Sequence, residues 1–162
     1  MKTILIIAML LAIENGAQAR IGEAEHHIAL RYSSVGIPSL EGRDPLGNKQ
    51  HAYKFRQFIV MVSFENGFSV CETFFKRADG ANEKWFRPNE IESILKANAA
   101  SGVRWKEIVE HVVWETSDGK LEAINRFGQL QVSTKKYADR IAAANKQKKA
   151  QEPRRDSERS RH

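Results

Sequence analysis

The fold of this 162-residue chain is decided by residues 53–76, which read YKFRQFIVMVSFENGFSVCETFFK. β-Branched and aromatic side chains dominate both halves of this stretch, as is typical of strands. Asn66 and Gly67 separate the halves, and both residue types tolerate the positive φ that a two-residue hairpin turn requires. We therefore predict a strand over 53–64, a tight turn, and a second strand over 68–76.

The residues before this hairpin predict a helix and then a loop. Ile21, Ala24, Ile28 and Tyr32 are spaced so that they form one apolar stripe on a helix over 21–32. Residues 39–50 are polar and contain Gly42, Asp44-Pro45 and Gly47-Asn48, which favours a loop.

The residues after the hairpin predict a helix followed by further strands. Pro88 suits the first turn of a helix that ends before residue 101. Segment 103–110 fits either a strand or a short helical turn. Asp118-Gly119 predicts a second hairpin between strands at 111–116 and 120–126, and a turn at Phe127-Gly128 precedes a short strand over 129–133.

Together these elements predict an α+β fold. Hairpin-linked strands are antiparallel, so we expect an antiparallel sheet of two hairpin units, about four to five strands, with helices packed on one face. A basic C-terminal helix and a disordered charged tail complete the expected fold.

The first nineteen residues have the pattern of a secretory signal peptide. Lys2 gives a positive start, residues 3–13 are apolar, and Ala17-Gln18-Ala19 ends the segment with small residues. The apolar part is about eleven residues, against about 20 for a membrane span. We expect a signal peptide at 1–19, an α+β domain at 20–134, a helix at 135–150 and a disordered tail at 151–162. The exported protein would be periplasmic or extracellular, and not an integral membrane protein once the leader is cleaved.

The net charge of +6 belongs to the C-terminal segment. Residues 20–134 hold 15 basic and 15 acidic side chains, whereas residues 135–162 hold 10 basic and 4 acidic ones. Any attraction to anionic partners should therefore reside in this segment. The possible anion contacts are Lys135, Lys136, Arg140, Lys146, Lys148, Lys149, Arg154 and Arg155.

Several motifs carry a resemblance to envelope proteins. Residues 21–24 (IGEA), Arg31-Tyr32 and residues 36–38 (GIP) resemble the G-E-S…R-Y-G-x-P opening of small exported bacterial proteins of unknown function. Asn66-Gly67, Trp105 and residues 114–120 (WETSDGK) fit the same group. The opening is also similar to the SmpA/OmlA (BamE-like) envelope domain, although the lipid-bearing Cys is absent. The resemblance implies an exported α+β domain and no particular activity.

No catalytic or cofactor motif is evident. There is no Walker, G-x-G-x-x-G, G-x-S-x-G or H-E-x-x-H sequence. The single Cys71 lies in a strand and is interpreted as a buried, inert side chain. The aromatics Tyr53, Phe55, Phe58, Trp105 and Trp114 fit a core better than a ligand-stacking surface. We expect no catalytic residues, no metal and no cofactor.

Three functional hypotheses follow. The first is a non-enzymatic exported domain that binds another protein or an envelope component through its sheet or hairpin loops. The second is a binder of anionic polymers, meaning nucleic acid, acidic polysaccharide or a lipid surface, through the cationic tail, with nucleic acid the least favoured of these. The third is a small hydrolase or metal-dependent enzyme, for which Cys71, His27, His51 and His111 would have to converge.

Overall fold

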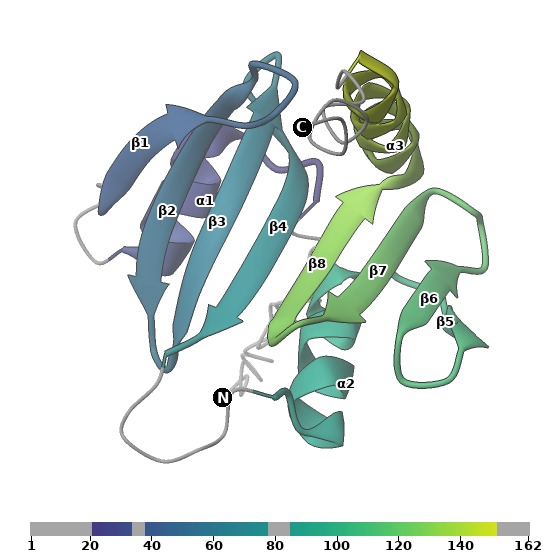
Figure 1. Ribbon diagram of the computed structural model, residues 1–162. Coiled ribbons are helices and arrows are strands. Elements are labelled where there is room, and N and C mark those ends of the chain that lie inside the picture. Colours follow the sequence, from purple (N-terminus) through teal and green to yellow (C-terminus); the bar gives the residue numbers. More distant parts are fainter. Residues whose placement is uncertain (1–20, 34–37, 78–84, 152–162) are drawn as a thin grey trace, which may run out of the picture.

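The computed structural model describes residues 21–33, 38–77 and 85–151 (Figure 1). The signal peptide expected at 1–19 lies outside the described residues, as does the expected tail beyond residue 151.

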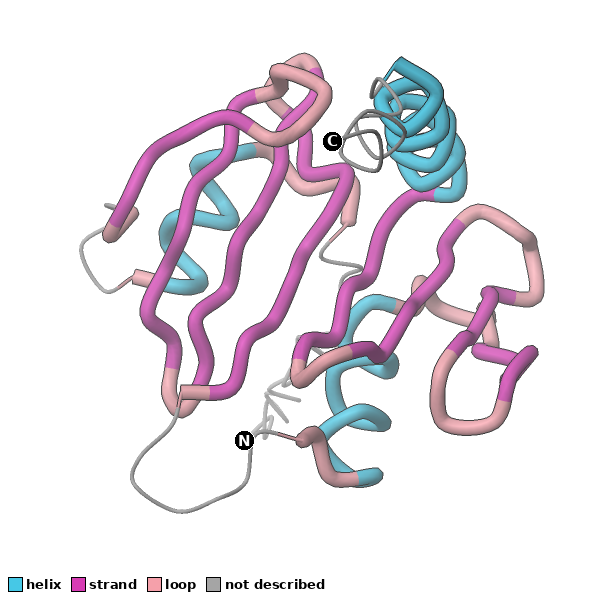
Figure 2. The backbone as a smooth tube through the Cα atoms, in the orientation of Figure 1, coloured by secondary structure: helices cyan, strands magenta, loops and turns pink. Residues whose placement is uncertain are grey.

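Three helices and eight strands alternate along the chain. Their order is α1 (Glu25–Tyr32), β1 (Leu40–Arg43), β2 (Lys49–Phe55), β3 (Phe58–Glu65), β4 (Phe68–Lys76), α2 (Pro88–Asn98), β5 (Trp105–Val109), β6 (Val113–Thr116), β7 (Leu121–Arg126), β8 (Gln129–Thr134) and α3 (Lys135–Gln151). The strands form one sheet in the order β1-β2-β3-β4-β8-β7-β6-β5, and every neighbouring pair is antiparallel. The sheet is thus two four-stranded meanders, each preceded by a helix, whose last strands β4 and β8 pair with each other (Figure 2).

The α+β class, the β-hairpins and the antiparallel pairing are confirmed, but the prediction of about four to five strands in two hairpin units is wrong. Three segments account for the difference. The expected loop at 39–50 contains β1 and the start of β2, and segment 103–110 contains β5. The run 53–64 is not one strand, because a turn at Arg56-Gln57 divides it between β2 and β3.

The core lies between the sheet and the two helices α1 and α2, which Figure 1 shows behind it. Alternate β3 side chains point to this side, and Val60 and Val62 are completely buried. Ile28 of α1 is also completely buried. The Trp105 indole N–H of β5 donates to the Leu95 carbonyl of α2 at 2.7 Å, which ties the outermost strand to this helix.

The helix α3 lies on the opposite side, so the expectation that all helices pack on one face is also wrong. Its Tyr137 hydroxyl donates to Asp44 Oδ2 at 2.9 Å and lies 3.5 Å from Ser63 Oγ. Ser63 alternates along β3 with the core residues Val62 and Phe64, and so faces away from α1 and α2. The helix therefore covers one end of the second sheet face.

Two ion pairs also anchor α3, one to each meander. Arg140 pairs with Glu65 at the β3–β4 turn, and Lys135 Nζ lies 2.9 Å from Glu115 Oε1 of β6. Of the helices in the described ranges, none is both long and apolar enough to cross a membrane.

Candidate binding surface

Among the described residues, the only helix on the sheet face opposite α1 and α2 is α3, which covers one end of it. The composition of this face follows from the strand register. One row of half-buried side chains crosses six strands in the order Ala52, Met61, Thr73, Gln131, Ile124 and Val113. A parallel row consists of Lys54, Ile59, Phe75, Gln129 and Arg126. We call these two rows the open face.

The chemistry of the open face is mixed. Ile59, Met61 and Ile124 supply apolar surface, while the two glutamines of β8 offer amide donors and acceptors. Such a combination of apolar area and neutral hydrogen-bonding groups is characteristic of protein interfaces rather than of sites for small charged ligands. The open face is therefore a candidate protein-binding surface.

The same face is closed at the end beneath α3. Cys71 pairs in register with Ser63 and Ser133, and all three side chains are buried there. Burial raises the pKa of the Cys71 thiol to about 12, and the hydrogen bond with Thr73 offsets only part of this rise. A thiol with this pKa is almost wholly protonated at neutral pH and is a poor nucleophile.

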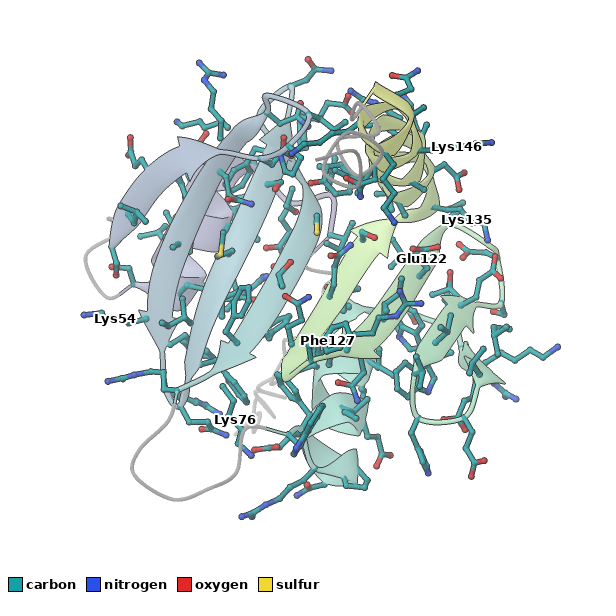
Figure 3. All side chains as sticks on the ribbon, in the orientation of Figure 1. Lys54, Lys76, Glu122, Phe127, Lys135 and Lys146 are labelled. Carbon is teal, nitrogen blue, oxygen red and sulfur yellow. The ribbon has the colours of Figure 1, made fainter. Side chains whose placement is uncertain are left out.

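The predicted anion contacts divide into three groups. Lys135 and Arg140 are engaged with Glu115 and Glu65, so they anchor α3 instead of facing a ligand. Lys136 is exposed near the start of the helix. Lys146, Lys148 and Lys149 are exposed on its last turns, and Figure 3 shows Lys146 extending away from the sheet. Arg154 and Arg155 lie outside the described residues.

Burial in the sheet also affects an acidic residue near the start of α3. Burial raises the pKa of Glu122 on β7, and the nearby Lys135 ammonium works in the opposite direction. In Figure 3 the labelled Glu122 and Lys135 lie next to each other, beside the base of α3. The start of the helix is thus occupied by compensating charges.

The four residues of the enzyme hypothesis do not converge. Cys71 belongs to the open side of β4, whereas His51 is buried on the helix side of β2. His27 is exposed on α1, and His111 lies in the β5–β6 turn of the other meander. These positions supply no cysteine–histidine pair. In the described ranges no group of three or more His, Cys, Asp or Glu side chains is arranged to hold a metal ion.

His51 has the most unusual environment of the histidines. It lines a hollow of about 470 Å³ that also involves Glu25, His26 and Glu41. Its Nδ1 lies 3.2 Å from the Tyr53 hydroxyl, and its Nε2 lies 3.6 Å from Glu41 Oε1. Burial lowers the pKa of His51, and the carboxylate of Glu25 offsets only part of this effect. The ring is therefore held neutral at the edge of the core.

The aromatic residues considered for ligand stacking belong to the core side of the sheet. Tyr53, Phe58 and Trp114 are buried there, and Trp105 is bonded to α2. They are packing residues, as expected. What sequence reasoning missed is the open face, because its rows exist only once β4 pairs with β8, whose partner residues lie 54 or more positions apart in the chain.

No family model, no curated protein and no solved structure matches this chain.

Proposed function

We propose that this chain is an exported, non-enzymatic binding module that engages a protein partner, or another envelope component, through the open face. The observation that carries the proposal is the asymmetry of the sheet. Two helices bury one face, whereas the part of the chain that the structure describes covers the other face only at one end, with α3. An exposed, partly apolar face with its own hydrogen-bonding groups is a feature of interaction sites.

Export enters the proposal from the sequence. The leader expected at 1–19 supports a location in the periplasm or outside the cell. A partner would then belong to the same compartment, which makes envelope fractions the material to search.

The test is a pull-down from envelope fractions with surface variants as bait. Met61→Arg places a charge in the middle of the open face, and Leu30→Arg places the same charge on the exposed side of α1. We expect Met61→Arg to reduce recovery of a specific partner about tenfold, because a charge in the centre of an interface is poorly tolerated. Leu30→Arg should recover that partner as well as the wild-type chain does.

Equal recovery with both baits would exclude the open face as the site. Recovery of no reproducible partner by the wild-type bait would count against the binding-module function itself. Circular dichroism of the two variants serves as the control for folding.

A second function is favoured by the end of α3. Lys146, Lys148 and Lys149 lie towards the C-terminal end of the helix, and all three are exposed. We propose, as the alternative to partner binding through the open face, that this cationic end binds anionic polymers. Replacing all three by Gln should abolish binding to heparin, and wild-type binding should weaken steeply with salt. Heparin binding that survives the replacement would contradict this proposal.

A further inference from the structure

The strand register brings scattered cationic and aromatic residues together at one end of the sheet. The β2–β3 turn consists of Arg56 and Gln57, and the Arg77 N–H donates to the Gln57 carbonyl at 2.8 Å. Phe75 of β4 pairs with Gln129, which also pairs with Arg126 across the β7–β8 turn. The β2–β3 turn, the end of β4 and the β7–β8 turn therefore share one end.

The segment leading into α2 reaches the same end. Lys76 Nζ donates to the Trp85 carbonyl at 3.2 Å, and it is also 3.0 Å from Glu90 Oε2. Trp85 is 65% exposed. We call this set the turn-end patch: Lys54, Arg56, Arg77, Trp85, Arg126 and Phe127. Figure 3 labels two of its members, Lys54 and Phe127. Figure 3 shows Lys135 and Lys146 at the opposite end, so the patch is separate from the cationic helix α3.

Phe127 is the most unusual residue of the patch. Its side chain is 89% exposed, and its φ of 51° lies in the left-handed region that large side chains disfavour. The corresponding turn of the first meander has Asn66 at this position, with a φ of 54°. Asn is among the few residues that adopt this conformation readily. At Phe127 the chain therefore accepts both backbone strain and an exposed aromatic ring, and a combination of this kind is typical of a functional position.

The charge around Phe127 is positive. Lys54, Arg56, Arg77 and Arg126 are all exposed.

One carboxylate at this end is neutralised, because Glu90 is paired with Lys76. At the next turn, Glu107 accepts a hydrogen bond from the His111 backbone N–H, and Glu110 is exposed. The four exposed cations outnumber these two carboxylates, and the excess positive charge is available to an anionic partner.

We propose that the turn-end patch binds the surface of an anionic lipid bilayer. Phe127 and Trp85 would enter the interfacial region, where aromatic side chains are favoured, and the surrounding cations would meet lipid phosphates. A single-stranded nucleic acid fits less well, because base stacking uses rings held on a platform, whereas Phe127 projects from the tip of a hairpin. The patch shares Lys54 and Arg126 with the second row of the open face, but Phe127, Trp85, Arg56 and Arg77 lie outside that surface, and the inference does not depend on the proposed function.

The test is vesicle sedimentation with Phe127→Asn. The vesicles contain either equal parts of phosphatidylcholine and phosphatidylglycerol or phosphatidylcholine alone. We expect the wild-type chain to bind the anionic vesicles, and Phe127→Asn to weaken that binding about tenfold because an apolar side chain no longer enters the interface. Asn suits the turn better, so the thermal unfolding midpoint of this variant should be equal to or higher than that of the wild type.

Two controls make the test specific. Phe68→Asn makes the same change at an exposed Phe next to the β3–β4 turn, at the opposite end of the sheet, and should leave binding unchanged. All variants are compared in the full chain and again in a chain beginning at Arg20, since the apolar segment 3–13 could itself bind vesicles.

The charge contribution is tested by Arg56→Glu combined with Arg126→Glu, which should abolish binding to the anionic vesicles. Replacing Lys146, Lys148 and Lys149 by Gln should not. The proposal is overturned if vesicle binding follows these three lysines and ignores Phe127, or if neither vesicle binds. It is also overturned if a single-stranded oligonucleotide binds in a Phe127-dependent manner while the vesicles do not.

Discussion

Removal of a single hydroxyl group, by Tyr137→Phe, tests whether α3 is an integral part of the domain. The Tyr137 hydroxyl donates to Asp44 Oδ2 at 2.9 Å, and both side chains are buried. Burial raises the pKa of Tyr137, so the hydroxyl stays a protonated donor at neutral pH. A hydrogen bond to a charged group contributes about 1.5–3 kcal/mol to stability. In the variant, Asp44 Oδ2 still accepts a hydrogen bond from Asn48 Nδ2 at 3.0 Å. The expected decrease in the free energy of unfolding is therefore near the lower end of this range, about 1.5–2 kcal/mol.

The assay is urea unfolding followed by tryptophan fluorescence. We expect a lower urea concentration at the unfolding midpoint. The dependence of the free energy of unfolding on urea concentration should be unchanged, because the variant exposes the same area when it unfolds. In a domain of this size the loss corresponds to a fall of roughly 4–10 °C in the melting temperature. Lys136→Ala, on the exposed side of the same helical turn, should change stability by less than about 0.5 kcal/mol.

A double-mutant cycle with Asp44→Asn isolates the contact between the two side chains. The coupling energy should be at least about 1 kcal/mol, because the residues are in direct contact. A coupling near zero, or a Tyr137→Phe variant as stable as the wild type, would refute the argument that this hydrogen bond secures α3 across the sheet.

Three further predictions follow from ionisable groups. Cys71, whose thiol pKa burial raises to about 12, should react with a thiol reagent at pH 8 only as fast as the chain unfolds; rapid reaction in the native state would contradict its placement. Burial lowers the pKa of His51, so the unfolded chain binds more protons than the folded chain as the pH falls. The free energy of unfolding should therefore be highest above pH 6.5 and decrease below it. His51→Gln should make this decrease smaller, whereas His27→Gln should leave it unchanged. Burial alone would raise the pKa of Glu90, but hydrogen bonds from the Arg87 backbone and Lys76 together outweigh this effect, so the pKa is lowered. The stability that the ionised Glu90 contributes should therefore be lost as the pH falls below about 4. Glu90→Gln should make the unfolding midpoint less sensitive to acid in that range.

The elements with strong local signals could be predicted from the sequence. Asn66-Gly67 and Phe127-Gly128 both mark observed hairpin turns, because a glycine at positive φ follows the first turn residue in each. Pro88 begins α2, and the helix expected at 135–150 is one residue shorter than α3.

The missed strands lacked such signals. The β2–β3 turn places Arg56 at a φ of 52°, and neither Arg nor Gln is a turn-forming residue type, so the run 53–64 resembles one strand. β1 is exposed along its whole length, so it has no apolar alternation to distinguish it from a loop.

The two candidate surfaces were beyond sequence reasoning for a different reason. The open face needs the pairing of β4 with β8, and the turn-end patch needs that pairing and both hairpin turns. Lys54 and Arg126 lie 72 positions apart in the chain, and only the sheet brings their strands into a common row. Long-range register of this kind is not encoded in local propensity.

The measurement that tests the proposed function most directly is site-specific photocrosslinking in envelope fractions. A photoreactive residue at Gln131 lies in the first row of the open face, and the same residue at Glu92 lies on the exposed side of α2. We predict that Gln131 captures one defined protein and that Glu92 does not. Capture of the same protein from both positions, or from Glu92 alone, would contradict the assignment of the open face as the binding surface.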